Sequence, residues 1–126
     1  MQPKLKKWLT DLVAACDLIL GHTAGQSLAQ YETDRFLQSG VERNFEVIGQ
    51  ILMRMSRTAP EVTTRITGYR DIIGFRNVLA HGYDVVDHGR VWRVIQENLP
   101  TLRAEAGDLL AETEHDEPPD SSDVQQ

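Results

Sequence analysis

The sequence of 126 residues contains a single cysteine, Cys16, so no disulfide can form within the chain. This excludes a small secreted scaffold held together by disulfides. Long hydrophobic runs are also missing. Asp11 and Asp17 interrupt the most apolar stretch well before the roughly 18 residues that a membrane span requires. We therefore expect a soluble cytoplasmic protein without a membrane segment, in which Cys16 is buried in an apolar helical stripe rather than reactive.

Motifs for common cofactors are absent as well. The sequence has neither a G-x-x-x-x-G-K-[ST] loop nor a G-x-G-x-x-G fingerprint, so we do not expect it to bind ATP through either motif. His22, His88 and His115 do not combine with Cys, Asp or Glu at the spacing of a zinc site. We expect no metal and no cofactor.

The net charge of −6 is unevenly distributed along the chain. Eight of the 19 acidic residues lie in residues 104–126, which contain no Lys or Arg, so residues 1–103 carry 11 acidic and 13 basic side chains. The C-terminal end is charged, rich in proline and free of aromatic residues, a composition typical of disorder. We predict a helical domain over 1–112 and an acidic, disordered tail over 113–126. The overall charge therefore does not argue against a polyanionic partner for the domain.

Apolar residues recur at helical spacing in several segments, and no segment shows the alternation of a strand. The predicted fold is all-α, a bundle of four to five helices. The helix over 69–81 is apolar nearly all round and is therefore expected to be buried. Helices are predicted from Leu5 to near Gly21 or Gly25, over 33–57, over 69–81, and from Arg90 to Leu110 with a kink or split at Pro100, with a weaker helical or turn segment over 61–67.

The end of the helix over 69–81 carries residues that a helical bundle does not require. Arg76 falls on an apolar stripe, where burying an unpaired guanidinium is costly, so it suggests a bound anion or a buried carboxylate partner. His81 and Tyr83 follow at five and seven residues. Arginine binds phosphate oxygens and histidine transfers protons near neutral pH, so a cleft holding both would suit phosphodiester chemistry. The structural alternatives are ordinary ion pairing, interaction of His81 with terminal carbonyls, and a core aromatic role for Tyr83.

The stretch RNVLAHGY resembles the R-x4-H-x-Y signature of HepT-like toxins, which are members of the HEPN ribonuclease superfamily. Two further segments support this resemblance. VERNFEVIG at 41–49 is similar to the second-helix signature of the family, and Val91-Trp92 with Leu99-Pro100-Thr101-Leu102 is similar to its last-helix pattern. Gln50-Ile51 departs from the pattern, where the family often has an acidic residue followed by alanine. The resemblance covers residues 5–112.

This resemblance implies a HEPN domain that forms a homodimer, with the motif helices of two subunits meeting in a shared cleft. It implies a metal-independent endoribonuclease that cleaves tRNA or mRNA by attack of the ribose 2′-hydroxyl, leaving a 2′,3′-cyclic phosphate. His81 would act as general acid/base, Arg76 would stabilise the phosphorane, and Asn77 would support the site. Tyr83 matches the tyrosine to which a cognate minimal nucleotidyltransferase antitoxin adds AMP, which would block the cleft and repel RNA phosphates.

The expected function is therefore the toxin of a type VII-like HEPN/MNT toxin–antitoxin system. The alternative is a non-catalytic HEPN module that binds nucleotide or docks a nucleotidyltransferase, and a helical scaffold without a site is a third reading. Glu42 and Glu46, four residues apart, could face the cleft, although surface ion pairing with Arg43 is the simpler expectation.

Overall fold

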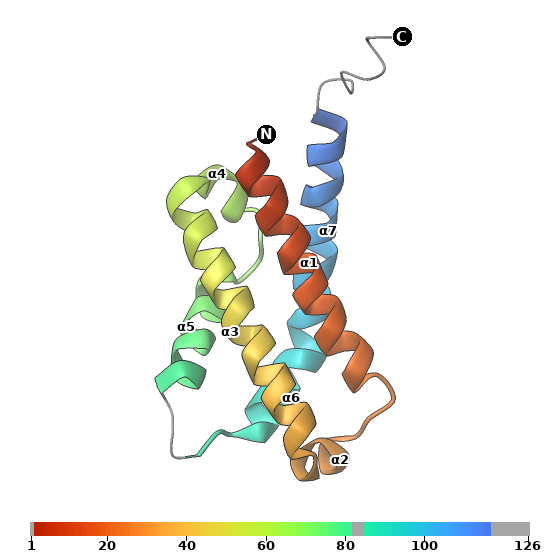
Figure 1. Ribbon diagram of the computed structural model, residues 1–126. Helices are drawn as coiled ribbons and strands as arrows, with labels where there is room; N and C mark the ends of the chain where they lie inside the picture. Colours follow the sequence, from red (N-terminus) through yellow and green to blue (C-terminus); the bar gives the residue numbers. More distant parts are fainter. Residues whose placement is uncertain (1, 82–84, 117–126) are drawn as a thin grey trace.

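The computed structural model describes residues 2–81 and 85–116, and in these residues the chain is helical with no strand (Figure 1). This confirms the all-α prediction, but the described residues form seven helices rather than four or five. The helices are α1 (Pro3–Thr23), α2 (Leu28–Thr33), α3 (Arg35–Thr58), α4 (Pro60–Thr63), α5 (Tyr69–His81), α6 (His88–Glu97) and α7 (Leu99–Asp116).

The larger number of helices has local causes. α2 was not predicted, and it begins at a reciprocal cap in which Gln30 N donates to Ser27 Oγ at 3.1 Å while Ser27 N donates to Gln30 Oε1 at 2.8 Å. α4 corresponds to the weak segment expected over 61–67. The last predicted helix is split into α6 and α7 next to Pro100, as expected, because proline is tolerated only in the first turn of a helix.

Three long helices, α1, α3 and α7, organise the bundle. α1 packs against both α3 and α7, and α5 packs against the other side of α3 (Figure 1). The short helices α2 and α6 lie together at the end of the bundle away from the start of α1, and α4 lies at the opposite end. The interior is filled by large side chains that are almost fully buried, among them Tyr31, Phe45, Leu9, Leu12, Ile48, Leu52, Met55, Ile95 and Leu102.

The prediction that the helix over 69–81 is buried all round is wrong, although its range matches α5. Ile72 and Phe75 are buried, whereas Val78 is 49% exposed. The reason is that α3 is the main packing partner of α5, so the side of α5 away from α3 remains at the surface. Apolar residues around a helix predict burial only when neighbours cover every side.

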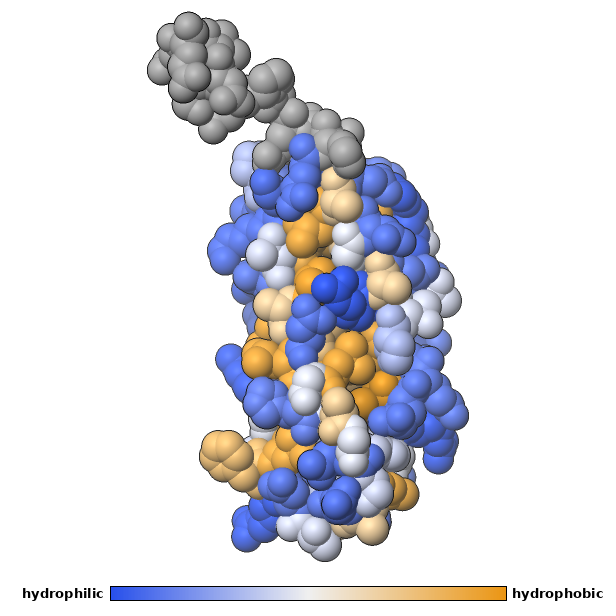
Figure 2. Space-filling model, turned by 90° about the vertical axis from the view of Figure 1, so that its right-hand side faces the viewer, coloured by the Kyte–Doolittle hydropathy of each residue, from blue (hydrophilic) through white to orange (hydrophobic). Residues whose placement is uncertain are grey.

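The C-terminal helix α7 continues through Asp116, so the predicted boundary between domain and tail falls inside a helix. Thr113 is buried, and its hydroxyl donates to the carbonyl oxygen of Leu110 at 2.7 Å. The remaining part of the predicted tail, 117–126, lies outside the described residues. On the face of the molecule shown in Figure 2, hydrophobic side chains show between hydrophilic ones. None of the described helices combines the length and apolar character needed to cross a membrane.

Candidate functional site

The part of the predicted motif from Arg76 to His81 lies on α5, which approaches α3 closely at Gly49 and Arg76. A Cβ atom added to Gly49 would lie 2.3 Å from Cβ and 2.5 Å from Cγ of Arg76, too close for two carbon atoms. Glycine inside a helix costs roughly 0.5–1 kcal/mol relative to alanine, so its position in α3 needs a structural reason. This contact supplies one. Without a side chain at position 49, the base of Arg76 can lie directly on α3.

Arg76 is half-buried, and its guanidinium has one hydrogen-bond partner among the described residues, because Nη1 donates to Oδ1 of the exposed Asn77 at 3.2 Å. Its Nε atom is buried and has no partner there. The sequence suggested either an anion or a carboxylate partner for this arginine. No acidic side chain in the described ranges forms an ion pair with Arg76. A charge held at the surface without a counter-ion can receive an anion.

The motif continues along α5 without a break up to His81. On a regular helix, five residues turn the chain so that the Cα atoms of Arg76 and His81 project about 140° apart. The side chain of His81 and the whole of Tyr83 lie outside the described residues. Their predicted meeting with Arg76 in one cleft therefore stays a prediction.

A second arginine, which the sequence analysis did not single out, lies close to the motif helix. Arg90 of α6 has its guanidinium carbon 5.7 Å from the ring centroid of Phe75, the residue that precedes Arg76. Phe75 is held in turn by an edge-to-face contact with Phe45 of α3, with ring centroids 5.2 Å apart. Asp87 caps α6, since its side chain accepts a hydrogen bond from Arg90 N at 3.1 Å. Only the contact between Arg90 and Phe75 in the folded chain shows that Arg90 adds positive charge here.

Three titratable side chains from α2, α3 and α6 form a second polar cluster. The ring of Tyr31 meets that of His88 edge-on, with centroids 6.0 Å apart, and lies 5.4 Å from that of Trp92. Tyr31 Oη and His88 Nδ1 are both buried without a hydrogen-bond partner in the described part of the chain. Sequence reasoning missed this cluster because its members are far apart along the chain and His88 precedes the helix predicted from Arg90.

Glu42 completes this cluster from α3. Burial raises the pKa of its carboxyl group, the charge of His88 opposes this rise, and the nearby charge of Glu46 adds to it. Burial, followed by the charge of Glu42, also raises the pKa of Tyr31. Raised carboxyl pKa values occur both in functional sites and in purely structural clusters, so the raised pKa of Glu42 does not by itself identify a site.

Several simpler expectations can be compared with the structure. Glu46 forms a surface ion pair with Arg43, with Oε2 and Nη1 3.6 Å apart, which confirms the simpler interpretation of that residue. Cys16 is fully buried, and burial raises the pKa of its thiol to about 12, so it is filler as predicted. Within the described residues, no three His, Cys, Asp or Glu side chains are grouped so that they could hold a metal ion.

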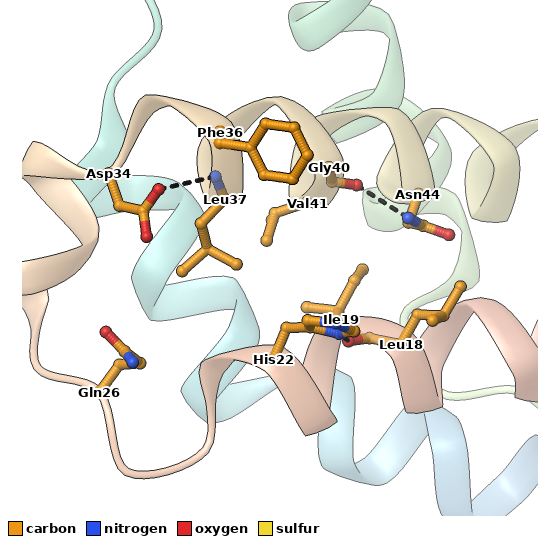
Figure 3. Close-up of a pocket in the computed structure, with 10 residues that line it drawn as sticks. All are labelled: Leu18, Ile19, His22, Gln26, Asp34, Phe36, Leu37, Gly40, Val41 and Asn44. Atoms are coloured by element: carbon orange, nitrogen blue, oxygen red, sulfur yellow. Dashed lines mark hydrogen bonds between the residues drawn. The ribbon is translucent and has the colours of Figure 1, made fainter.

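A pocket of about 310 Å³ lies between α1 and α3, and Arg76 does not line it (Figure 3). Its walls are mainly apolar, and Phe36, which is 92% exposed, lies at its edge. The lining residues are Leu18, Ile19, His22, Gln26, Asp34, Phe36, Leu37, Gly40, Val41 and Asn44. The motif and this pocket are therefore separate features of the surface.

Arg76 of α5 thus lies on a helix glycine of α3 and forms no ion pair with another described residue. The family model for ribonuclease HepT-like proteins matches residues 12–109. The chain belongs to this family. The match includes both helices that hold Gly49 and Arg76, and it confirms the resemblance drawn from the motif.

Several relatives carry names that refer to ribonucleases. A protein of Methanocaldococcus jannaschii named "Gamma-glutamylcyclotransferase and putative RNase" is 26% identical over 112 residues, which are 89% of this chain and 50% of that protein. The chain thus spans half the length of this relative. "Probable ribonuclease HepT" of Thermococcus cleftensis is 27% identical over 107 residues, covering 82% of this chain and 93% of that protein. No solved structure matches the chain.

Proposed function

We propose that this HepT-like protein is a metal-independent endoribonuclease of the cytoplasm and the toxin of a HEPN/MNT toxin–antitoxin system. The main support is Arg76, a half-buried cation on the motif helix with no acidic partner among the described residues. In the proposed reaction, the ribose 2′-hydroxyl attacks the adjacent phosphorus and the 5′-oxygen leaves, which gives a 2′,3′-cyclic phosphate. Arg76 stabilises the charge that builds on the phosphorane oxygens.

His81 takes the proton from the 2′-hydroxyl or gives one to the leaving 5′-oxygen, roles that suit an imidazole near neutral pH. Asn77 supports the site by accepting the hydrogen bond from Arg76, which restricts the guanidinium. Catalysis then needs no metal, because charge stabilisation and proton transfer both come from side chains.

We further propose that the active form is a homodimer with the cleft between two copies of α5. The uncovered side of α5 supports this, since Val78 is 49% exposed and Val85, just after the motif, is 86% exposed. The projection of Arg76 and His81 about 140° apart also favours a shared cleft, in which each chain presents different motif residues to one RNA.

Silencing would occur at Tyr83, to which a cognate nucleotidyltransferase adds AMP. Each added AMP would bring a negative phosphate into the proposed cleft, where it would both occupy space and repel the RNA backbone. Intact mass after coexpression with the antitoxin should show one or more AMP units, which the Tyr83→Phe variant lacks. An inhibited toxin of unmodified mass would mean that the antitoxin acts by binding alone.

The activity is tested by incubating the purified full-length protein with RNA in the presence of EDTA. We expect cleavage to persist, to yield cyclic phosphate ends, and to be lost in His81→Ala. Cys16→Ala serves as a control because its buried thiol lies in the core. A partner-free wild-type protein that is folded and cleaves no RNA would instead favour the non-catalytic HEPN module that binds nucleotide or docks a nucleotidyltransferase.

A further inference from the structure

A second positively charged surface lies between the N-terminal half of α1 and the C-terminal half of α3. The two helices run side by side in opposite directions, so the start of α1 lies near the end of α3 (Figure 1). Two hollows follow one another along this junction. The first has a volume of about 400 Å³ and is lined by Lys7, Trp8, Asp11, Val47, Gln50, Ile51 and Arg54. The second, of about 320 Å³, is lined by Lys4, Trp8, Arg54, Arg57 and Thr58.

Four cations from the two helices border this groove. Lys4 and Lys7 are three residues apart on α1, and Arg54 and Arg57 are three residues apart on α3, so each pair lies on one side of its helix. All four are exposed. The two lysines of α1 and the two arginines of α3 therefore form two short rows of positive charge, one on each side of the groove.

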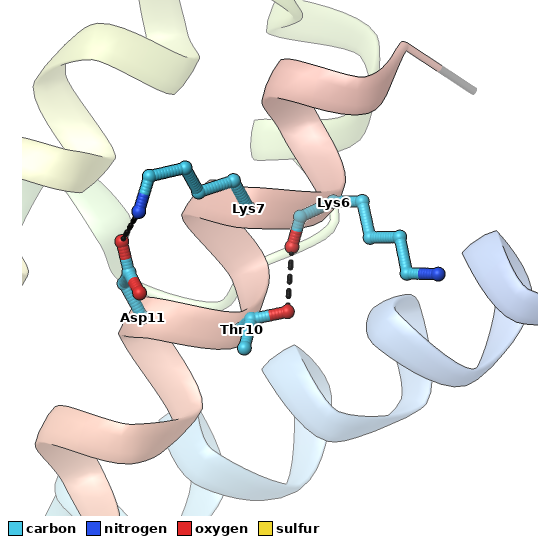
Figure 4. A network of polar contacts seen from close by, with 4 residues as sticks. All are labelled: Lys6, Lys7, Thr10 and Asp11. Carbon is cyan, nitrogen blue, oxygen red and sulfur yellow. Dashed lines mark hydrogen bonds and ion pairs between the residues drawn. The ribbon is translucent and has the colours of Figure 1, made fainter.

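Most of this charge is not neutralised. Lys7 pairs with Asp11, with Nζ and Oδ2 3.0 Å apart (Figure 4). Arg54 and Arg57 form no ion pair with any other described residue. Lys6, which lies between Lys4 and Lys7 in the sequence, points to the other side of α1 in Figure 4 and is not part of the groove. In a chain with a net charge of −6, such a local excess of positive charge needs an explanation.

An aromatic ring lies in the middle of these cations. Trp8 is half-buried, lines both hollows, and has Lys4 Nζ 5.8 Å from its ring centroid. Cations combined with an exposed aromatic surface are the features with which proteins bind single-stranded nucleic acid, because the cations hold phosphates and the ring stacks on a base. An acidic polypeptide would need the cations but would gain little from the indole.

We propose that this groove, defined by Lys4, Lys7, Trp8, Arg54 and Arg57, binds the phosphate backbone of single-stranded RNA. The inference rests on the proposed ribonuclease function for its biological meaning. The groove is nevertheless separate from the motif, because no residue of α5 lines it and neither does Gly49. It would hold a part of the RNA chain away from the cleavage point. Such a site increases affinity without reading sequence, because phosphates carry no base information.

The test measures binding of a fluorescent single-stranded RNA by the full-length protein with the His81→Ala substitution, which keeps the RNA intact. Replacing Arg54 and Arg57 together with alanine should weaken binding roughly 10-fold. It should also reduce the slope of log affinity against log salt by about 1.4, since each phosphate contact to a single strand contributes about 0.7. The double variant Arg35→Ala with Arg93→Ala is the matched control, because it removes the same charge from exposed positions elsewhere.

Tryptophan fluorescence gives a second measurement. The chain has two tryptophans, and Trp92→Phe leaves Trp8 as the only tryptophan whose emission is observed. RNA should quench this emission, and the quenching should disappear when Arg54 and Arg57 are replaced. Equal RNA binding by the groove variant and the charge-matched control, with no quenching of Trp8, would overturn the proposal.

The outcomes separate this inference from the ribonuclease proposal. If the wild type cleaves no RNA but the groove variant loses binding, the catalytic proposal fails and the RNA groove stands. If the wild type cleaves RNA and the groove variant binds RNA normally, the groove proposal fails alone. Fluorescent polyglutamate is measured in the same assay as an acidic polypeptide. If the groove variant loses only the binding of polyglutamate and not of RNA, the surface serves an acidic polypeptide and the RNA proposal is wrong.

Discussion

Two parts of the molecule differ in whether their polar side chains have hydrogen-bond or ion-pair partners. Around α7 they are paired: Arg103 Nε donates to Asp17 Oδ1 at 2.8 Å, Arg65 pairs with Glu112, and the Thr67 hydroxyl donates to Glu105 Oε2 at 2.9 Å. Around α2, α5 and α6, three side-chain atoms are buried without a partner in the described part of the chain. They are Tyr31 Oη, Arg76 Nε and His88 Nδ1. Paired groups link helices, whereas the three unpartnered atoms remain able to bond with a ligand or a partner.

Two arginines make this difference concrete, because each lies against a glycine. Arg103 is ion-paired with Asp17, to which its Nε and Nη2 atoms donate hydrogen bonds, and its Nη1 atom would lie 2.5 Å from a Cβ added to Gly107. Arg76 touches Gly49 through the base of its side chain and has only Asn77 as a polar partner among the described residues. Arg103 links α7 to α1, and Arg76 keeps its charge available.

Replacing these two arginines should therefore give opposite results. Arg76→Ala should lower RNA cleavage about 100- to 1000-fold, the effect of losing one donor to a developing oxyanion, with little change in melting temperature. Arg103→Ala should leave cleavage unchanged and reduce the free energy of unfolding by no more than about 1 kcal/mol, because the pair with Asp17 is largely exposed. Single-turnover cleavage and thermal unfolding measure the two effects. Equal loss of activity in both variants would contradict the distinction.

The two glycines should differ for the same structural reason. Gly49→Ala forces Cβ against Cβ and Cγ of Arg76, which cannot move without separating α3 from α5, so we expect a loss of about 1–3 kcal/mol in unfolding free energy. Gly107→Ala meets only the flexible end of Arg103 and gains up to roughly 1 kcal/mol of helix propensity. Chemical denaturation of both variants checks the comparison. A stable Gly49→Ala protein with full cleavage would show that the close contact does not position Arg76.

The parts of this picture that the sequence could predict are those set by local pattern. The range of α5 follows from the spacing of its apolar residues, and Arg76 was recognised because arginine is out of place in that spacing. α2 was missed because it depends on the cap between Ser27 and Gln30 rather than on an apolar stripe. The contact with Gly49 could have been suspected, since glycine inside a helix needs a reason, but its partner depends on how two helices cross.

Substitutions at two glutamates should have the smallest effects on melting temperature. These effects should have opposite signs, because the pKa values of the two carboxyl groups are shifted in opposite directions. Burial raises the pKa of Glu42 above its usual value near 4.5, and His88 of α6, Tyr31 of α2 and Glu46 of α3 are the titratable groups that act on it or respond to it. Its folded form thus favours the protonated carboxyl. The stability that Glu42 contributes is fully present below pH 4.5 and is lost as pH rises through its folded pKa.

Glu112 behaves in the opposite way, because its hydrogen bond with Arg65 lowers its pKa. The stability that it contributes is present above its unfolded pKa and is lost as pH falls through the folded one. At pH 7, Glu42→Gln should therefore raise the melting temperature and Glu112→Gln should lower it, the latter only slightly because the pair is exposed and screened by salt. The effect of Glu42→Gln should shrink as pH falls towards 4.5, whereas the effect of Glu112→Gln should shrink only below pH 4.5, as pH falls through the lowered folded pKa of Glu112. If Glu42→Gln instead lowered the melting temperature at pH 7, the charged carboxylate would have a favourable partner, and Tyr31 and His88 would be the first candidates.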